Sequence, residues 1–326
     1  MYPMVMRASG LLARAIGNLS LAKDCEARAN DSGHDFVAAL YNGKFFSYGS
    51  QVDGTGRADN IMFSGMLAGQ MLSRHAGWGD LPGVSWDAVV SSMRQQLATH
   101  VANSYNFYPP KVYNLSSMSA AIDPGNHNEA STWPFYLEGY SAAAAIQAGF
   151  LEDGLDVIRH IGLLNLRLGL GWAQNLWNPG FLTYVTAPVT WFVPDVLAAA
   201  GLDAQSKTLF LAPTLRPTED RVVLPLFFPQ FWATVEATRT GGGQRGGRIT
   251  LQIVKHYGRA VSVLKVRAQP IGVASANGTT ATLAKAFLCE AGATLDLSAH
   301  WNNLVGSSVI RDRVLPPHPP TSIHGV

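Results

Sequence analysis

The spacing of apolar residues changes near residue 205, and this change constrains the fold more than any other feature. Before it, apolar side chains recur with the 3.6-residue period of amphipathic helices. One such stripe consists of Trp86, Val89, Val90, Met93, Leu97 and Val101. After it, short β-branched or aromatic runs lie between Pro and Gly, and Ile249, Leu251 and Ile253 occupy alternate positions. The sequence therefore predicts helices followed by a smaller antiparallel β region.

Other segments of the first part repeat the helical pattern. Leu12, Ile16 and Leu19 mark one apolar stripe, and a third stripe consists of Trp133, Tyr136, Leu137, Tyr140 and Ala144. Residues 153–168 are apolar on several sides, which predicts a helix buried on several sides. Roughly six helices, or three helical hairpins, are expected before the β region.

The second part contains six candidate strands. They are Leu209 to Leu211, Val222 to Phe228, Phe231 to Thr238, Arg248 to His256, Ala260 to Ala268 and Ala281 to Leu288. The glycine-rich stretch 241–247 predicts a mobile hairpin connection, and LPPHPP at 315–320 predicts an extended tail. The expected division is a helical catalytic-type domain at 1–205, a β-rich subdomain at 206–314 and a Pro-rich tail at 315–326.

Composition argues against several classes of partner. Charged residues make up 14% of the 326 residues, the formal net charge is +2, and no basic run of five occurs, so nucleic acid and anionic membranes are not expected. Apolar runs are too short to cross a bilayer, and the N-terminal residues lack the pattern of a secretory signal, which favours the cytoplasm. Cys25 and Cys289 fit neither a zinc spacing nor a disulfide framework, which predicts free thiols.

Known cofactor and metal motifs are absent from the sequence. It contains no HExxH, no GxSxG and no GxxxxGK[ST], and the glycines at 54–56 do not follow a strand with a dinucleotide fingerprint. No metal and no cofactor are therefore expected. His75 is predicted to end a helix and satisfy a carbonyl there rather than to act as a ligand or base.

Several patches of sequence resemble one family in order and spacing. They are NGKFFSYGS at 42–50, Ile61 and Met62 before LAGQ at 67–70, residues 131–155, and Tyr184 to Trp191. Together they resemble the C-terminal half of the catalytic region of glycoside hydrolase family 116, which contains β-glucosidases and bile-acid-type glucosylceramidases. The resemblance implies part of an (α/α)6 toroid of helical hairpins that cleaves a β-linked glycoside with retention. This chemistry needs two carboxyl groups about 5 to 5.5 Å apart, one ionised and one protonated.

The sequence departs from the family at the residue that protonates the leaving group. The position that corresponds to the family's acid residue is occupied here by Gly65, which has no carboxyl group. Asp59 is the nearest carboxyl upstream and Asp53 is the next candidate, so these are the predicted catalytic residues. The structural alternative is that Asp59 caps the helix expected to start at Asn60 or Ile61, a common role of Asp. The family nucleophile, a Glu of the earlier toroid half, has no counterpart in this sequence.

Carbohydrate-binding residues are predicted on two further segments. Trp172, Asn175 and Trp177 offer aromatic faces and an amide where the family carries a Glu and an Arg, and Glu129 precedes Trp133 near a family acidic position. Each also has a structural reading, because Trp beside an apolar helix usually packs in a core and Glu129 lies close to a helix start.

Two functions follow from these observations. The first is a glycoside hydrolase acting on β-linked glucosides or related glycosides, represented here by the half that lacks the nucleophile and completed by an N-terminal half or by self-association. The second is a noncatalytic carbohydrate-binding or scaffolding protein of the same architecture, which the Gly at position 65 favours. Both predict a carbohydrate or glycoside as the ligand.

Overall fold

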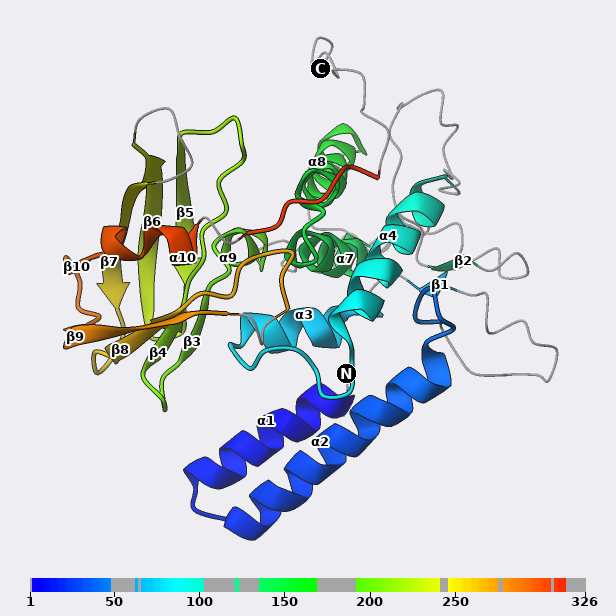
Figure 1. Cartoon of the computed structure of the whole chain (residues 1–326), viewed down its shortest axis with the longest axis horizontal. Helices are drawn as coiled ribbons and strands as arrows, with labels where there is room; N and C mark the ends of the chain where they lie inside the picture. Colours follow the sequence, from blue (N-terminus) through cyan, green and yellow to red (C-terminus); the bar gives the residue numbers. More distant parts are fainter. Residues whose placement is uncertain are drawn as a thin grey trace.

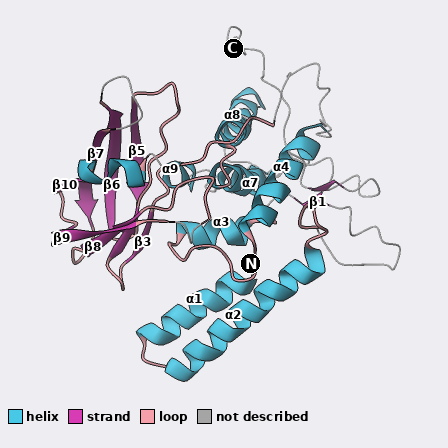
Figure 2. Ribbon diagram, in the orientation of Figure 1, coloured by secondary structure: helices cyan, strands magenta, loops and turns pink. Residues whose placement is uncertain are grey.

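The computed structural model describes residues 2–47, 62–63, 66–102, 121–122, 135–168, 192–240, 246–274, 278–305 and 308–314. Helices come first in the chain and sheets second, and the two parts lie side by side (Figure 1). The predicted order is thus confirmed. The described residues form a mixed α and β fold, however, rather than a mainly α one (Figure 2).

Seven helices precede the sheets within the described ranges. They are α1 (Tyr2–Ala15), α2 (Leu19–Leu40), α3 (Ala68–His75), α4 (Trp86–Ala102), α7 (Phe135–Gln147), α8 (Leu151–Leu168) and α9 (Phe192–Leu197). Two short strands, β1 (Met62–Phe63) and β2 (Ala121–Ile122), pair antiparallel beside them. These helices do not by themselves establish a six-hairpin toroid.

The core of the helical part is built on α7. Its alanine-rich turn from Ala142 to Ala145 is almost completely buried, and the predicted α4 stripe is buried against the same cluster at Val89, Met93 and Leu97. Helix α8 packs closely on α7 at Gly154, where an added Cβ would lie 2.6 Å from Cγ1 of Ile146. The first turns of α8 are mostly buried, as its pattern predicts.

Helices α1 and α2 form a hairpin at the lower edge of the molecule (Figure 1). The residues buried in this hairpin are not those of the apolar stripe predicted from the sequence. Small residues of α1, among them Gly10, face α2, and a Cβ added at Gly10 would lie 3.4 Å from Cβ of Cys25. The predicted stripe instead points away, because Leu12 is 65%, Ile16 71% and Leu19 58% exposed. The helical pattern around Leu12 was predicted correctly, but the predicted stripe does not form one helix face: α1 ends at Ala15, Ile16 lies in the turn, and Leu19 begins α2.

Two four-stranded sheets make up the second part. Their strands are β3 (Gly201–Asp203), β4 (Thr208–Phe210), β5 (Arg221–Phe227), β6 (Phe231–Arg239), β7 (Gly247–His256), β8 (Ser262–Arg267), β9 (Thr280–Leu288) and β10 (Thr294–Asp296). One sheet has the antiparallel order β10-β7-β6-β5, and the other has the order β3-β4-β8-β9 with a parallel β4–β8 pair. A short helical segment follows, η5 (Ser298–His300) with α10 (Trp301–Leu304).

The sheets share one apolar core, and their pattern confirms the predicted alternation. Ile249, Leu251 and Ile253 of β7 are buried, and the same cluster holds Val263 and Val266 of β8. Strands β6 and β7 are antiparallel neighbours, so the stretch between them joins a hairpin as predicted, although residues 241–245 lie outside the described part. All six predicted strands are found with shifts of one or two residues at their ends.

The chain returns from the sheets to the helices at its described end. In residues 308–314, the Arg311 backbone N–H donates to Gly149 O (2.8 Å) and the Val314 N–H donates to Oδ2 of Asp153 (3.0 Å). Arg313 forms an ion pair with the buried Asp156 of α8. This segment therefore fastens the end of the β part to helix α8.

The two cysteines are free, as predicted, and both are buried. Burial raises the pKa of Cys289 to about 12. No helix in the described ranges is both long and apolar enough to span a bilayer. The predicted tail at 315–326 lies outside the described part.

Candidate functional site

All the site residues predicted from the sequence lie outside the described part of the chain. They are Asp53, Asp59, Glu129, Trp133, Trp172, Asn175 and Trp177, and the Gly65 register lies outside it as well. Their roles therefore stay predictions. The described elements show where the segments that carry them join the fold.

Two of these segments join the fold next to each other. Strand β1 begins at Met62, three residues after Asp59, and strand β2 ends at Ile122, seven residues before Glu129. Met62 and Ile122 are direct partners in the antiparallel pair. The segment before Met62 and the segment after Ile122 thus start from neighbouring points at one end of the ribbon.

The LAGQ motif opens helix α3, and its Gln70 has a structural role. Gln70 is 3% exposed; its Nε2 donates to Oδ1 of Asp80 (2.7 Å), and its Oε1 accepts from the Leu81 backbone N–H (2.8 Å). Both ends of the amide are therefore satisfied within the chain. These two hydrogen bonds hold the loop after α3 against the helix, and they explain why a polar side chain is buried at this position.

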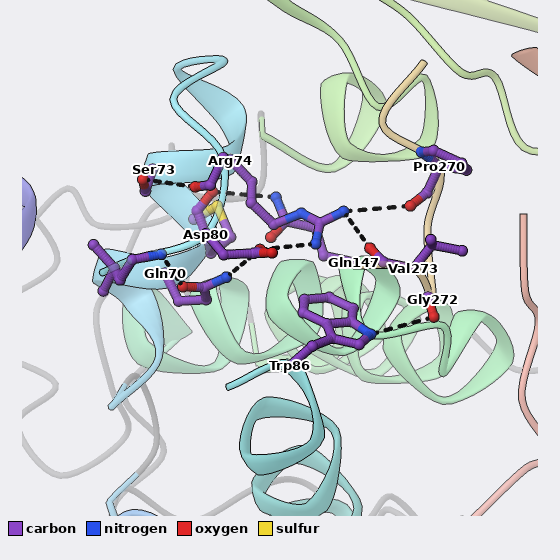
Figure 3. Close-up of polar contacts among 12 residues, drawn as sticks. Gln70, Ser73, Arg74, Asp80, Trp86, Gln147, Pro270, Gly272 and Val273 are labelled. Carbon is purple, nitrogen blue, oxygen red and sulfur yellow. Dashed lines mark hydrogen bonds and ion pairs between the residues drawn. The ribbon is translucent and has the colours of Figure 1, made fainter. Parts of the chain in front are cut away.

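One turn later, Arg74 joins helix α3 to the β part (Figure 3). Its guanidinium pairs with Asp80 (3.0 Å) and donates to Pro270 O (3.3 Å) and Val273 O (2.9 Å), on the segment that follows β8. The Trp86 ring lies 4.4 Å from its Cζ, and the indole N–H donates to Gly272 O (3.3 Å). Burial lowers the pKa of Arg74 and Asp80 opposes this shift, so the charge remains paired at the junction.

The next residue of the helix, His75, faces a small cavity at the same junction. The cavity is lined by Arg74, His75, Gln147, Asp195, Val196, Ala199, Ala200, Gln269 and Ile271. Three lining atoms are buried without a hydrogen-bond partner: Nδ1 of His75, Oδ1 of Asp195 and Nε2 of Gln269. His75 ends α3 as predicted, but its Nδ1 satisfies no carbonyl.

His75 and Asp195 lie close together in this cavity, and burial favours the uncharged form of each. Nε2 of His75 lies 3.9 Å from Oδ2 of Asp195, which is too long for a hydrogen bond. Burial raises the pKa of Asp195 to about 7, opposed by a hydrogen bond from the Phe227 backbone, and burial lowers the pKa of His75. Because desolvation penalises both charges, the imidazole is neutral at pH 7, and the carboxyl group of Asp195 is protonated to a large extent at the same pH.

The cavity is too small for a sugar. About 10 Å³ is available to the centre of a water molecule, which is the space that one buried water needs. A cavity of this size at the junction between helices and sheets does not suit a substrate site.

No metal site is formed by the described residues. Within those ranges, no three His, Cys, Asp or Glu side chains come together in a way that could hold a metal ion. The sequence predicted neither the Arg74 junction nor the His75 cavity. The available signal was the polar pair Gln70 and Arg74, one turn apart on an otherwise packed helix.

Comparisons with known proteins give only distant structural similarity. The chain matches no protein-family model and no curated protein. Among solved structures it is similar to an α-L-rhamnosidase from Dictyoglumus thermophilum (TM-score 0.42, 11% identity, 80% of this chain and 25% of that one). It is also similar to a GH78 family rhamnosidase from Bacillus sp. GL1 (0.39, 18%, 77% and 23%).

A third similar structure is a candidate kojibiose phosphorylase from the human microbiome (TM-score 0.35, 11% identity, 86% of this chain and 32% of that one). The chain thus spans a quarter to a third of the length of these structures. All three names refer to enzymes of glycosides, and none refers to family 116. At these TM-scores, the similarity decides neither the fold nor the activity of this chain.

Proposed function

We propose that this chain supplies the C-terminal half of a retaining glycoside hydrolase of the family 116 type, acting on a β-linked glucoside or a related glycoside. In this proposal Asp59, or in second place Asp53, protonates the leaving oxygen. Glu129, Trp133, Trp172, Asn175 and Trp177 shape the sugar site, residues 1–205 belong to the toroid, and residues 206–314 form an appended β subdomain.

The observation that carries the proposal is the ordered set of family-like patches at 42–50, 61–70, 131–155 and 184–191. The packing of two of these patches supports it. Gln147, at the end of α7, donates from Nε2 to Met71 O of α3 (3.1 Å), so the LAGQ helix and the alanine-rich helix are neighbours. The β1–β2 pair likewise supports a common location for the Asp59 and Glu129 segments, because it joins their ends.

A noncatalytic carbohydrate-binding or scaffolding role is the second candidate. Gly65 at the register of the family acid favours it, and so does the absence of a Glu and an Arg from residues 173–182. Binding of a β-glucoside without turnover, in a protein that also contains the earlier toroid half, would support this second role.

The test is Asp59→Asn in that complete protein. Hydrolysis of alkyl β-glucosides should fall by about 10²- to 10⁴-fold, because a poor leaving group needs protonation. Hydrolysis of 2,4-dinitrophenyl β-glucoside should be largely retained, because this leaving group departs as the anion.

Asp53→Asn serves as the matched control, since it removes a carboxylate from the same segment. An equal loss on both substrates would assign Asp59 to a structural role. That role is not the predicted cap of a helix starting at Asn60 or Ile61, because residues 62–63 form strand β1 and the next described helix, α3, begins at Ala68. If Asp53→Asn alone gives the selective loss, the acid role moves to Asp53.

A further inference from the structure

Three aromatic side chains lie together on the outer face of the sheet that contains β5, β6 and β7. Phe227, Trp232 and Tyr257 are 49%, 44% and 38% exposed, whereas Leu226 and Ala233, which alternate with them along the strands, are buried in the core between the sheets. Phe227 and Trp232 are direct partners in the β5–β6 pair, and Tyr257 follows the end of β7. We call these three residues the aromatic row. Exposed apolar side chains that cluster in this way mark a binding surface more often than single ones do.

The rings of the aromatic row hold one another in position. The ring centroids of Phe227 and Trp232 are 5.7 Å apart at an interplanar angle of 87°, and those of Trp232 and Tyr257 are 5.5 Å apart at 69°. Both contacts are edge-to-face, which is a favourable arrangement for aromatic pairs. Nζ of Lys255, the cross-strand partner of Trp232, lies 6.0 Å from the Trp232 centroid and 5.1 Å from that of Tyr257. A ligand would therefore meet rings that are already ordered.

The next row of the same face offers hydrogen bonds. Pro225, Thr234, Gln252 and Thr294 are successive cross-strand partners on β5, β6, β7 and β10, and we call them the polar row. Side chains two residues apart on a strand lie on one face about 7 Å apart. Each Thr hydroxyl and the Gln amide can both donate and accept a hydrogen bond. A ligand ring stacked on Trp232 therefore brings its edge within reach of the polar row.

Charge on this face selects an uncharged ligand. The ammonium group of Lys255 already lies beside the rings of Trp232 and Tyr257, so it would repel a cationic ligand from them. At the far end of the face, Nε of Arg221 donates to Oε1 of Glu236 (2.8 Å), which leaves that cation paired. A polyanion needs several cations along its path. The ligand that fits has apolar ring faces, a polar edge and no net charge.

The area of the aromatic row fits a small ligand better than a protein. A Phe, Tyr or Trp buries roughly 150–250 Å² when fully covered, so the three rings at their observed exposures offer about 300 Å². A stable protein partner covers about 800 Å² on each side. A lipid bilayer would also have to remove water from Thr234 and Gln252 of the polar row, at a cost in free energy.

We propose that this face binds a neutral glycan, with a sugar ring stacked on Trp232 and its hydroxyl groups hydrogen-bonded to the polar row. Sugar rings combine apolar C–H faces with a hydroxyl-bearing edge, which is the combination that the two rows match. Rings inclined at 69° and 87° to one another cannot all lie flat on a planar surface, so the ligand is a single chain in solution and not a crystalline polymer. The inference goes beyond the proposed function, because it concerns the β part and uses none of the residues assigned there.

Affinity electrophoresis of the full 326-residue chain tests the proposal. The gels contain one of four neutral soluble polysaccharides: hydroxyethyl cellulose, a mixed-linkage β-glucan, a galactomannan or dextran. At least one of them should retard the chain. Trp232→Ala should lower the association constant about fivefold or more, as removal of one stacking ring does for other ring-shaped ligands. Trp232→Phe keeps a ring and should retain most of the binding, and Thr234→Val, which removes one hydroxyl of the polar row, should weaken it.

Leu288→Ala is the matched control, because Leu288 is also 44% exposed but lies on β9 of the other sheet. This variant should be retarded like the wild type. Asp59→Asn should also leave the retardation unchanged, which separates this site from the one in the proposed function.

Four results would overturn the inference. The first is no retardation by any of the four polysaccharides. The second is retardation that survives Trp232→Ala, which would place glycan binding elsewhere and leave the proposed function standing. The third is stronger retardation by carboxymethyl cellulose than by hydroxyethyl cellulose, which would assign the binding to charge. The fourth is flotation with phosphatidylcholine vesicles that depends on Trp232 and occurs without retardation by any polysaccharide, which would assign the face to a membrane.

Discussion

The carboxyl group of Asp195 provides the sharpest energetic prediction. It is 4% exposed on α9, faces the cavity at the junction, and has a pKa of about 7 instead of 3.8. A folded-state pKa above the unfolded value means that folding favours the protonated acid. The stabilisation is complete below pH 3.8 and is lost as pH rises to about 7.

The magnitude follows from the shift. A difference of about 3 pKa units corresponds to about 4 kcal/mol, of which about 2.5 kcal/mol is lost between pH 5 and pH 8. Asp195→Asn keeps the shape of the neutral acid and cannot ionise. The variant should therefore be more stable than the wild type at pH 8, and this advantage should be about 2.5 kcal/mol smaller at pH 5.

Urea unfolding followed by tryptophan fluorescence measures this difference at both pH values. Asp31→Asn on the exposed side of α2 controls for the change in net charge. The lowered pKa of His75 gives an opposite effect, because a buried neutral imidazole loses stability as pH falls below 6.5. A His75→Gln background therefore separates the two groups. An Asp195→Asn advantage that is the same at pH 5 and pH 8 in both backgrounds refutes the reasoning.

Two further predictions concern packing and reactivity. Gly154→Ala should lower the free energy of unfolding, measured by urea titration, by about 1–3 kcal/mol. The new methyl group would lie 2.6 Å from Ile146 Cγ1 and 2.7 Å from Ala142 O. The control, Gly246→Ala, should change the free energy of unfolding little, because its Cβ would meet only Thr240 Oγ1, at 3.6 Å. Cys289 should react with a thiol reagent only after unfolding, because burial raises its pKa to about 12, and a native reaction rate near that of free cysteine would contradict this.

Local pattern predicted much of the fold. The six strands of alternating or β-branched residues were located to within two residues, because one face of each must be buried. Strands β3 and β10 were missed, since three residues carry too little pattern to recognise. The stripe of Leu12, Ile16 and Leu19 was predicted as one helix face, but the chain turns between Ala15 and Leu19, and the buried face of α1 carries Gly10 and Ala13 instead.

Less of the candidate site than of the fold could be predicted from the sequence. Motif resemblance pointed to Asp59 and to Trp177, which lie outside the described residues, so the structure leaves these roles as predictions. The junction that the structure does describe depends on contacts across nearly 200 residues, such as Arg74 with Val273. No local pattern specifies such a partner. A buried arginine near Trp86 indicates only that some acceptor is required.

The return of residues 308–314 to α8 has a consequence for dividing the chain into separately expressed pieces. A truncated chain that ends after α10 would lose partners of Asp153 and Asp156, both nearly fully buried. A chain that ends after α9 would also lack the carbonyls of Pro270 and Val273, which accept hydrogen bonds from Arg74. The guanidinium would then keep only its ion pair with Asp80 and lose two acceptors. The helical part thus depends on hydrogen-bond acceptors from residues 270–273 and on hydrogen bonds and an ion pair from residues 308–314. Truncation between the two parts would damage it more than the boundary between helices and strands suggests.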